Sequence, residues 1–239
     1  MSKKIIGGVL LFLTALLILQ PNGVIMEGQP GWGWTLIKRT GSLEGVVLAL
    51  ESGKPLVKGE VLIEDGAVPI SQGRFLVQDL APGKYTLTIQ GPYRSPQTLT
   101  VSIKAGSNRL ETAVPCQLSP DEIAMLARIT RAEAEGEPFI GQVAVAATVL
   151  NRVTSPSYPA TVTKVVYQRV SGRYQYSPVG DGRINLRPND KAWRAAYAAL
   201  AGWDPTSGAT GFFNPAKTRD RWVHSRPATT QIGGHVFFN

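Results

Sequence analysis

The chain has 239 residues, of which 43% are hydrophobic and 18% charged, a balance that can bury a core and excludes global disorder. Lysine and arginine number 25 against 17 aspartates and glutamates, so the net charge of +8 favours a polyanionic partner, although solubility explains it equally well. Because Cys116 is the single cysteine, the chain forms no internal disulfide, and we expect a monomer stabilised by packing.

The N-terminus has the pattern of an export signal. Two lysines precede an apolar run of 15 residues from Ile5 to Leu19, as in the n-region and h-region of a signal peptide. The run is shorter than the roughly 20 residues of a spanning helix, but Val24-Ile25-Met26 extends it. Residues 1–26 are therefore predicted to be a signal peptide or a signal-anchor helix, the latter anchoring the chain in a membrane through residues 5–26. Either alternative places the remaining chain outside the cytoplasmic membrane.

The middle of the chain is predicted to be a small all-β sandwich, over residues 41–117. Residues 27–40, rich in glycine and tryptophan without a clear period, are interpreted as a linker before it. Short segments with alternating apolar residues and turn signals between them then follow, which is typical of a sandwich. These segments are 43–48, 59–63, 73–77, 84–89 and 99–103. No cluster of titratable residues stands out in this stretch of sequence, which favours a spacer over a sugar-binding module.

A helix is predicted to begin at Ser119. Ser119 suits the capping position, Pro120 suits the first helical position, and Glu122 completes an S-x-x-E capping box. One side of this helix is apolar and carries Ile123, Leu126, Ala127, Ile129 and Thr130. Glu133 falls on the same side, seven residues after Leu126 and four after Ile129. A carboxylate on an apolar face is unusual, because burial of its charged form is costly.

The position of Glu133 has two interpretations. Desolvation raises the pKa of a carboxyl group, and a carboxylic acid protonated near neutral pH can protonate a glycosidic leaving oxygen. Alternatively, Glu133 ends the helix and is hydrogen-bonded to a loop. Its neighbour Glu135 is expected to face solvent, and Glu137 is expected to cap the next helix, where negative charge suits the helix dipole.

That next helix is predicted over residues 141–152 and is almost wholly apolar. Gln142 and Asn151 are polar exceptions, and each is either a satisfied core amide or part of a cleft. A further helix is predicted from Asp190 to Ala201, with Trp193 and Tyr197 in the core.

Several sequence blocks resemble known families. Residues 73–87 resemble the carboxypeptidase regulatory-like or transthyretin-like sandwich, mainly in their turn residues. Residues 132–146, from Ala132-Glu133-Ala134-Glu135-Gly136-Glu137-Pro138 onward, resemble the opening motif of the SleB/CwlJ cell wall hydrolase family, which includes spore cortex-lytic enzymes. The resemblance continues, in the expected order, through residues 149–156, 175–185, 202–206, 212–216 and 225–237.

The second resemblance implies a multidomain chain whose residues 118–239 form a mainly α, lysozyme-like (α+β) catalytic domain. It implies a peptidoglycan glycosidase of the cell envelope or spore cortex, acting as a lytic transglycosylase on the glycan strands. Glu133 would be the general acid/base, protonating the oxygen between N-acetylmuramic acid and N-acetylglucosamine and then accepting a proton from the muramic acid 6-hydroxyl. The product would carry a 1,6-anhydromuramic end.

Further candidates for substrate binding lie in the matching blocks. Aromatic faces pack against sugar rings and amides bond N-acetyl groups, which makes Tyr176, Ser177, Phe213 and Asn214 candidates, together with Gln142 and His235. For Tyr176 and Phe213, a place in the core is the alternative interpretation. His235 lines a cleft or packs as an ordinary buried histidine. Asp181 is the remaining candidate and has two interpretations: it forms an Asp-Gly turn with Gly182, or it is a second carboxylate that positions water for hydrolysis.

The sequence also argues against several other functions. It has two histidines, His224 and His235, with no H-E-x-x-H motif and no cysteine pair, so we expect no metal and no cofactor. Nucleic-acid binding rests on net charge alone and conflicts with export. A wall-binding protein that holds glycan without cutting it is the main non-enzymatic alternative. Two departures from the family pattern, Glu135 in place of arginine and Tyr176 in place of phenylalanine, leave Glu133 unchanged.

Overall fold

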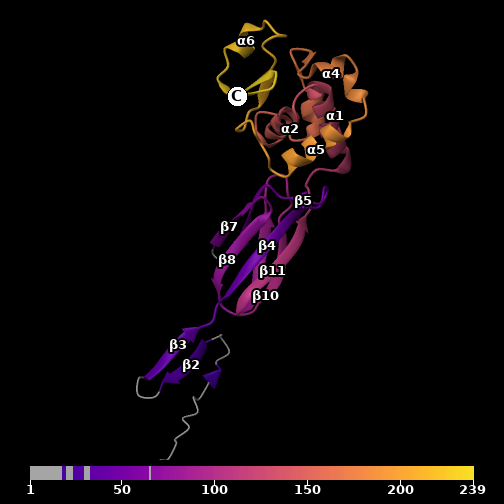
Figure 1. Cartoon of the computed structure of the whole chain (residues 1–239). Coiled ribbons are helices and arrows are strands. Elements are labelled where there is room, and N and C mark those ends of the chain that lie inside the picture. Colours follow the sequence, from indigo (N-terminus) through magenta and orange to yellow (C-terminus); the bar gives the residue numbers. More distant parts are fainter. Residues whose placement is uncertain (1–17, 20–23, 30–32, 65) are drawn as a thin grey trace, which may run out of the picture. The chain divides into compact units, whose positions relative to one another are not determined.

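The computed structural model describes residues 18–19, 24–29, 33–64 and 66–239 (Figure 1). Most of the predicted signal segment therefore lies outside the described residues. Within them, no helix combines the length and hydropathy required to cross a bilayer.

The N-terminal described residues form strands. β1 (Ile18–Leu19) pairs with β2 (Val24–Gln29), which pairs with β3 (Gly33–Lys38), and both pairings are antiparallel. These strands include residues 27–29 and 33–38 of the predicted linker, whose role as a linker stays a prediction. Both strands contain β-branched residues, which favour extended pairing, even though their order shows no clean alternation.

An antiparallel β domain follows, which confirms the predicted class of this region. Its strands are β4 (Gly41–Ala49), β5 (Lys54–Pro55), β6 (Lys58–Ile63), β7 (Gly66–Ser71), β8 (Arg74–Leu80), β9 (Gly83–Gln90), β10 (Gln97–Ile103) and β11 (Gly106–Val114). They form one curled sheet in the order β10-β9-β6-β7-β8-β4-β11, with β5 added on β4. The prediction of a sandwich of two separate sheets is therefore wrong. β7 and β8 pair through Ser71 and Arg74, and this pairing joins all the strands into one sheet.

Alternation of side chains builds the core of the β domain. In β4, every second residue from Gly41 is buried. Leu43 and Val47 of this strand belong to the core, as do Leu87 and Ile89 of β9. Gly45 is required by a close approach, because a Cβ atom at this position would lie 1.8 Å from the Phe75 ring.

The C-terminal half is mainly helical. Its helices are α1 (Pro120–Ala134), α2 (Phe139–Thr154), α3 (Val162–Val166), α4 (Ser177–Gly180), α5 (Asp190–Leu200) and α6 (Arg221–His224), with a 3-10 turn at Arg183–Asn185. A short pair, β12 (Arg169–Val170) and β13 (Arg173–Tyr174), precedes α4. A C-terminal sheet of β14 (Gly211–Phe213), β15 (Ala228–Ile232) and β16 (His235–Phe238) has the order β14-β16-β15. Figure 1 shows α1, α2 and α5 bundled together, with the C-terminal sheet and α6 beside them.

The three long helices enclose one apolar core, as their periodicity predicts. Leu126 and Ile129 of α1, Val143 and Leu150 of α2, and Leu200 of α5 are each 0% exposed and share it. Trp193 and Tyr197 are partly buried against this core, and their rings stack at 5.7 Å. The helix predicted from Asp190 to Ala201 is thereby confirmed, with Ala201 as its C-cap.

The helix starts are only partly as expected. The Ser119 hydroxyl accepts from the backbone N–H of Glu122 at 3.3 Å, which confirms the predicted cap. The Glu122 carboxylate, however, accepts from the N–H of Val162 and so ties α3 to α1. The second prediction, that Glu137 caps α2, is wrong: α2 begins at Phe139 after Pro138 and has no side-chain cap. Glu137 bonds a distant segment instead.

Candidate active site

An open cleft of about 480 Å³ lies between the helices and the C-terminal sheet. Helices α1, α2 and α4 supply one wall. Strands β14 and β16, with the loop that follows β14, supply the other. The lining combines a carboxyl group, several cations, aromatic rings and small polar groups. The lining residues are Glu133, Arg152, Gln175, Tyr176, Ser177, Arg183, Phe212, Phe213, Asn214, Lys217, Thr218, Val223 and His235.

Glu133 lies in the last turn of α1 and faces the cleft. The apolar face of α1 holds it there, because Leu126, Ile129 and Thr130 are completely buried one and two turns earlier. Burial raises the pKa of the Glu133 carboxyl from 4.5 to about 7, against the nearby positive charge of Arg183. Asp181 adds to this increase in pKa and Lys217 opposes it. Glu133 is therefore protonated in a large fraction of molecules at neutral pH.

Arg183 connects the end of α1 to the loop after α4. Its Nη1 donates to the carbonyl of Ala132 at 2.8 Å, while its Nε donates to the Asp181 carboxylate at 3.0 Å. The backbone N–H of Arg183 also donates to Asp181, and these hydrogen bonds lower the pKa of the Asp181 carboxyl. Asp181 is thus an exposed, ionised partner of Arg183. Gly182, with φ of 85°, completes the predicted Asp-Gly turn.

Tyr176 and Arg152 form the buried floor of the cleft. Tyr176 is 2% exposed and Arg152 is 9% exposed, yet both contribute to the lining. The Arg152 guanidinium carbon lies 5.1 Å from the centre of the Tyr176 ring and 5.0 Å from that of Tyr158. Its Nε donates to the carbonyl of Thr210 at 2.5 Å, which joins α2 to the start of the C-terminal sheet.

The opposite wall is formed by β14 and the loop after it. Phe212 packs against Tyr176 at 6.3 Å and against His235 at 5.2 Å between ring centres. Phe213 contacts His224 edge-on at 4.8 Å. The Asn214 carbonyl oxygen of the side chain accepts from the N–H of Ala216, so it fixes the turn that carries Lys217.

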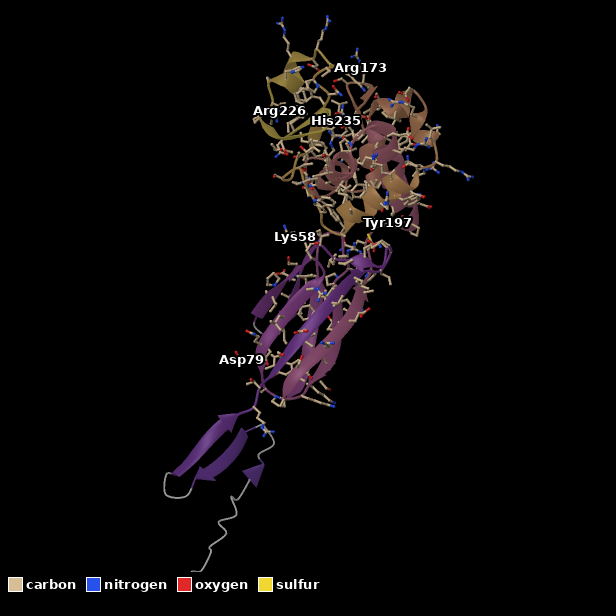
Figure 2. The ribbon with its side chains drawn as sticks, in the orientation of Figure 1. Lys58, Asp79, Arg173, Tyr197, Arg226 and His235 are labelled. Carbon is tan, nitrogen blue, oxygen red and sulfur yellow. The ribbon has the colours of Figure 1, made fainter. Side chains whose placement is uncertain are left out.

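His235 and Glu137 secure the hairpin between β15 and β16. The Glu137 carboxylate accepts from the N–H of Gly234 at 2.9 Å and lies 3.6 Å from Nδ1 of His235. Gly233 has φ of 57°, and a Cβ atom there would lie 2.0 Å from Glu137, so this turn needs glycine. Burial lowers the pKa of His235, which leaves its ring uncharged at neutral pH. Figure 2 shows His235 where the C-terminal sheet adjoins the helices.

Six of the eight residues predicted for the site line this cleft, and two do not. Glu133, Tyr176, Ser177, Phe213, Asn214 and His235 are brought together. Gln142 is 0% exposed and its amide N–H donates to the carbonyl of Glu135, so it is a core amide, although its own carbonyl oxygen has no partner among the described residues. Asp181 lies outside the lining and acts through Arg183. Asn151, the other polar exception of α2, bonds Asp204 and also lies outside the cleft.

The positively charged residues of the cleft were not among the residues predicted from the sequence. Arg152, Arg183 and Lys217 all line the cleft, and the last two act on the pKa of Glu133. A signal existed for Arg152, because a charged residue near the end of an otherwise apolar helix needs a buried partner. Nothing local marks Lys217. Among the described residues, no group of three or more histidines, cysteines or carboxylates is arranged to hold a metal ion.

The cleft thus combines a half-buried carboxyl group of raised pKa with aromatic and polar walls. Residues 136–238 match the model of the Cell Wall Hydrolase family. Together with the relatives described next, this match assigns residues 136–238 to the cell wall hydrolase family, as the motifs of this segment predicted. The matched segment begins three residues after Glu133 and does not itself include that carboxylate.

The curated relatives include a spore cortex-lytic enzyme of Bacillus cereus, 43% identical over 126 residues, and one of Halalkalibacterium halodurans, 42% identical over 128 residues. These alignments cover 53% and 54% of this chain but 47% and 38% of the relatives, so the chain spans half of their length or less. A solved catalytic domain from Bacillus anthracis, described as the germination-specific lytic transglycosylase SleB, is 43% identical. That alignment covers 51% of this chain and 97% of the domain, with a TM-score of 0.47.

Proposed function

We propose that this chain cleaves the glycan strands of bacterial peptidoglycan between N-acetylmuramic acid and N-acetylglucosamine, as a lytic transglycosylase with Glu133 as its general acid and base. The observation that carries the proposal is the Glu133 carboxyl, which lines the cleft and has its pKa raised to about 7. Family membership and the spore cortex-lytic relatives support the same substrate class.

The chemistry needs one carboxyl group used twice. Protonated Glu133 donates its proton to the glycosidic oxygen as the bond from C1 to that oxygen breaks. The ionised carboxylate then accepts the proton of the muramic acid 6-hydroxyl as the 6-oxygen bonds to C1. The saccharide supplies its own nucleophile, so no water is consumed and the new end is a 1,6-anhydromuramic acid. The enzyme returns with Glu133 protonated.

The surroundings of Asp181 support this single-carboxylate scheme over hydrolysis. A two-carboxylate glycosidase requires the second carboxylate to face the bond that breaks. Asp181 is exposed, outside the cleft lining, and engaged with both the backbone and the side chain of Arg183. Hydrolysis with Asp181 positioning water is the alternative mechanism, and product analysis separates the two.

The remaining assignments follow from the same proposal. Tyr176, Ser177, Phe213, Asn214 and His235 are proposed to contact the glycan, since all line the cleft. The proposed organisation is an export signal or anchor over residues 1–26, an accessory β domain over 41–117 and a lysozyme-like hydrolase domain over 118–239. The chain would act outside the cytoplasmic membrane, on the cell envelope or the spore cortex.

Zymography on purified sacculi tests the role of Glu133. We expect Glu133→Gln to lower clearing by about 10²–10⁴-fold, the usual contribution of a general acid, while binding to sacculi is retained. Glu135→Gln is the matched control, because Glu135 is an exposed carboxylate two residues away that pairs with Arg131 at 3.0 Å. Equal losses in both variants would contradict the proposal. Absence of clearing by the unaltered chain, with binding retained, would instead indicate a wall-binding protein.

Mass spectrometry of the released fragments tests the mechanism. Transglycosylation yields muramic ends that are lighter by one water than hydrolytic ends. We expect the anhydro products to predominate with the unaltered chain and with Asp181→Asn. Reducing muramic ends that disappear in Asp181→Asn would establish hydrolysis through Asp181 instead.

A further inference from the structure

Arg152 is a buried cation without a counter-ion. Its side chain is 9% exposed, and no carboxylate of the described residues lies within 4.0 Å of its nitrogen atoms. Its Nη1 is buried and has no hydrogen-bond partner among those residues. Burying an uncompensated charge costs several kcal/mol in general. A buried guanidinium of this kind is compensated when a bound ligand supplies the missing hydrogen-bond acceptor.

A second donor without a partner lies beside it. The Tyr176 hydroxyl is buried and likewise has no partner within the described part of the chain. Its ring lies against the Arg152 guanidinium at 5.1 Å, and both side chains belong to the cleft lining that contains Glu133. Burial raises the pKa of Tyr176 to about 12, so the hydroxyl keeps its proton at every physiological pH.

The Arg152 guanidinium and the Tyr176 hydroxyl both offer hydrogen-bond donors, so a ligand atom that contacts them must be an acceptor. Arginine only donates hydrogen bonds, and a buried guanidinium prefers electron-rich oxygen such as that of a carboxyl or amide group. The Arg183 and Lys217 side chains add positive charge to the same cleft. A carboxylate or amide oxygen therefore satisfies the floor of the cleft better than a sugar hydroxyl, which is a weaker acceptor.

In a peptidoglycan strand, both sugars carry an N-acetyl carbonyl, but muramic acid adds a lactyl ether whose acyl group supplies further such oxygens, and these alone can belong to a carboxylate, the stronger partner of a buried guanidinium. We propose that Arg152 and Tyr176 form a subsite for the acyl oxygens of this lactyl substituent, so that the cleft selects muramic acid over N-acetylglucosamine. This inference rests on the proposed function for its substrate class. The oxygens come either from a free lactyl carboxylate or from the amide carbonyl of a peptide-bearing muramic acid.

Binding to the full chain carrying Glu133→Gln tests the subsite without turnover. The probes are the tetrasaccharide of alternating N-acetylglucosamine and N-acetylmuramic acid, the same tetrasaccharide with L-alanine on each lactyl group, and chitotetraose. We expect both muramic probes to bind at least about tenfold more tightly than chitotetraose, since a hydrogen bond to a charged group contributes about 1.5–3 kcal/mol. The tighter of the two muramic probes identifies the carboxylate or the amide as the preferred source.

Adding Tyr176→Phe should weaken the muramic probes about fivefold to tenfold and leave chitotetraose unchanged, because only the hydroxyl is lost. Tyr158→Phe is the matched control: its ring also lies against Arg152, but its hydroxyl bonds Thr210 and it does not line the cleft. We expect no change in selectivity from it.

The inference is overturned if Glu133→Gln binds chitotetraose as tightly as the muramic probes. It is also overturned if Tyr176→Phe weakens all three probes equally or none of them. Failure of the proposed function is a separate outcome, because it is judged by clearing of sacculi by the unaltered chain and not by this selectivity.

Discussion

Two buried arginines, Arg94 in the β domain and Arg152 in the helical domain, show how differently the two regions treat a buried charge. Arg94 is 2% exposed and forms a two-point ion pair with Glu51, at 2.5 and 2.7 Å. It also donates to the carbonyl of Val114. Arg152 is similarly buried, but its contacts are a backbone carbonyl and two tyrosine rings.

The difference separates a structural charge from one available to a ligand. A buried, hydrogen-bonded ion pair holds segments together, although the Nε of Arg94 is itself buried without a partner among the described residues. Removal of one member of such a pair leaves the other uncompensated. A buried cation without a carboxylate lowers stability unless something binds it. Functional sites commonly retain such costly groups, and the Glu133 carboxyl in the same cleft is a second example.

The largest expected effect follows from removing the paired arginine. Arg94→Met leaves the Glu51 carboxylate, whose side chain is 12% exposed, without its cation. We expect a loss of about 3–5 kcal/mol in the free energy of unfolding, measured by urea denaturation. The Glu51→Gln/Arg94→Met double variant removes both charges and should lose less than Arg94→Met alone. A double variant as unstable as the sum of the single variants would show that the pair is not coupled.

The second effect concerns the pH dependence of stability. The pKa of Glu133 is raised to about 7 in the folded chain, whereas that of an unfolded glutamate is about 4.3. Between these values the folded chain holds a proton that the unfolded chain has released, so stability falls as pH rises and the full cost is present above pH 7. Glu133→Gln removes this cost.

We therefore expect Glu133→Gln to be more stable than the unaltered chain by about 3–4 kcal/mol at pH 8, with almost no difference at pH 4. Thermal unfolding at the two pH values measures this, with Glu135→Gln giving the background of an exposed carboxylate. The kcat/KM for sacculi should fall as pH rises through about 7, because the free enzyme loses its acid. A gain in stability that is equal at both pH values would contradict the shifted pKa.

Local patterns predicted the helices and the side of α1 that carries Glu133, because both depend on periodicity within one helix. The face of α1 that carries Leu126 and Ile129 fixes the direction of Glu133 without knowledge of the remaining fold. Partners distant in sequence were not predictable in this way. Glu137 precedes a helix and looks like a cap, but its carboxylate bonds Gly234, which lies 97 residues later.

The same limit explains the residues that were missed or misplaced in the cleft. Gln142 and Arg152 lie on one apolar helix, and the helical period alone does not tell which of them meets the cleft. That depends on Tyr176 and Thr210, which contact Arg152 from segments beyond α2. The single curled sheet of the β domain was likewise not predictable. Alternating apolar residues indicate where the strands lie but not the order in which they pair.

The smallest change in the free energy of unfolding is expected for substitution of Arg152, the arginine without a counter-ion. This substitution tests the comparison with Arg94 most directly. Arg152→Met removes a hydrogen bond to Thr210 and the contacts with two rings, but it also removes an uncompensated buried charge. These changes oppose each other, so we expect the free energy of unfolding to change by less than about 1 kcal/mol in urea denaturation. A loss as large as that of Arg94→Met would show that the charge of Arg152 is satisfied within the fold. In that case the floor of the cleft is part of the structural core, and selectivity for muramic acid must arise from other residues of its lining.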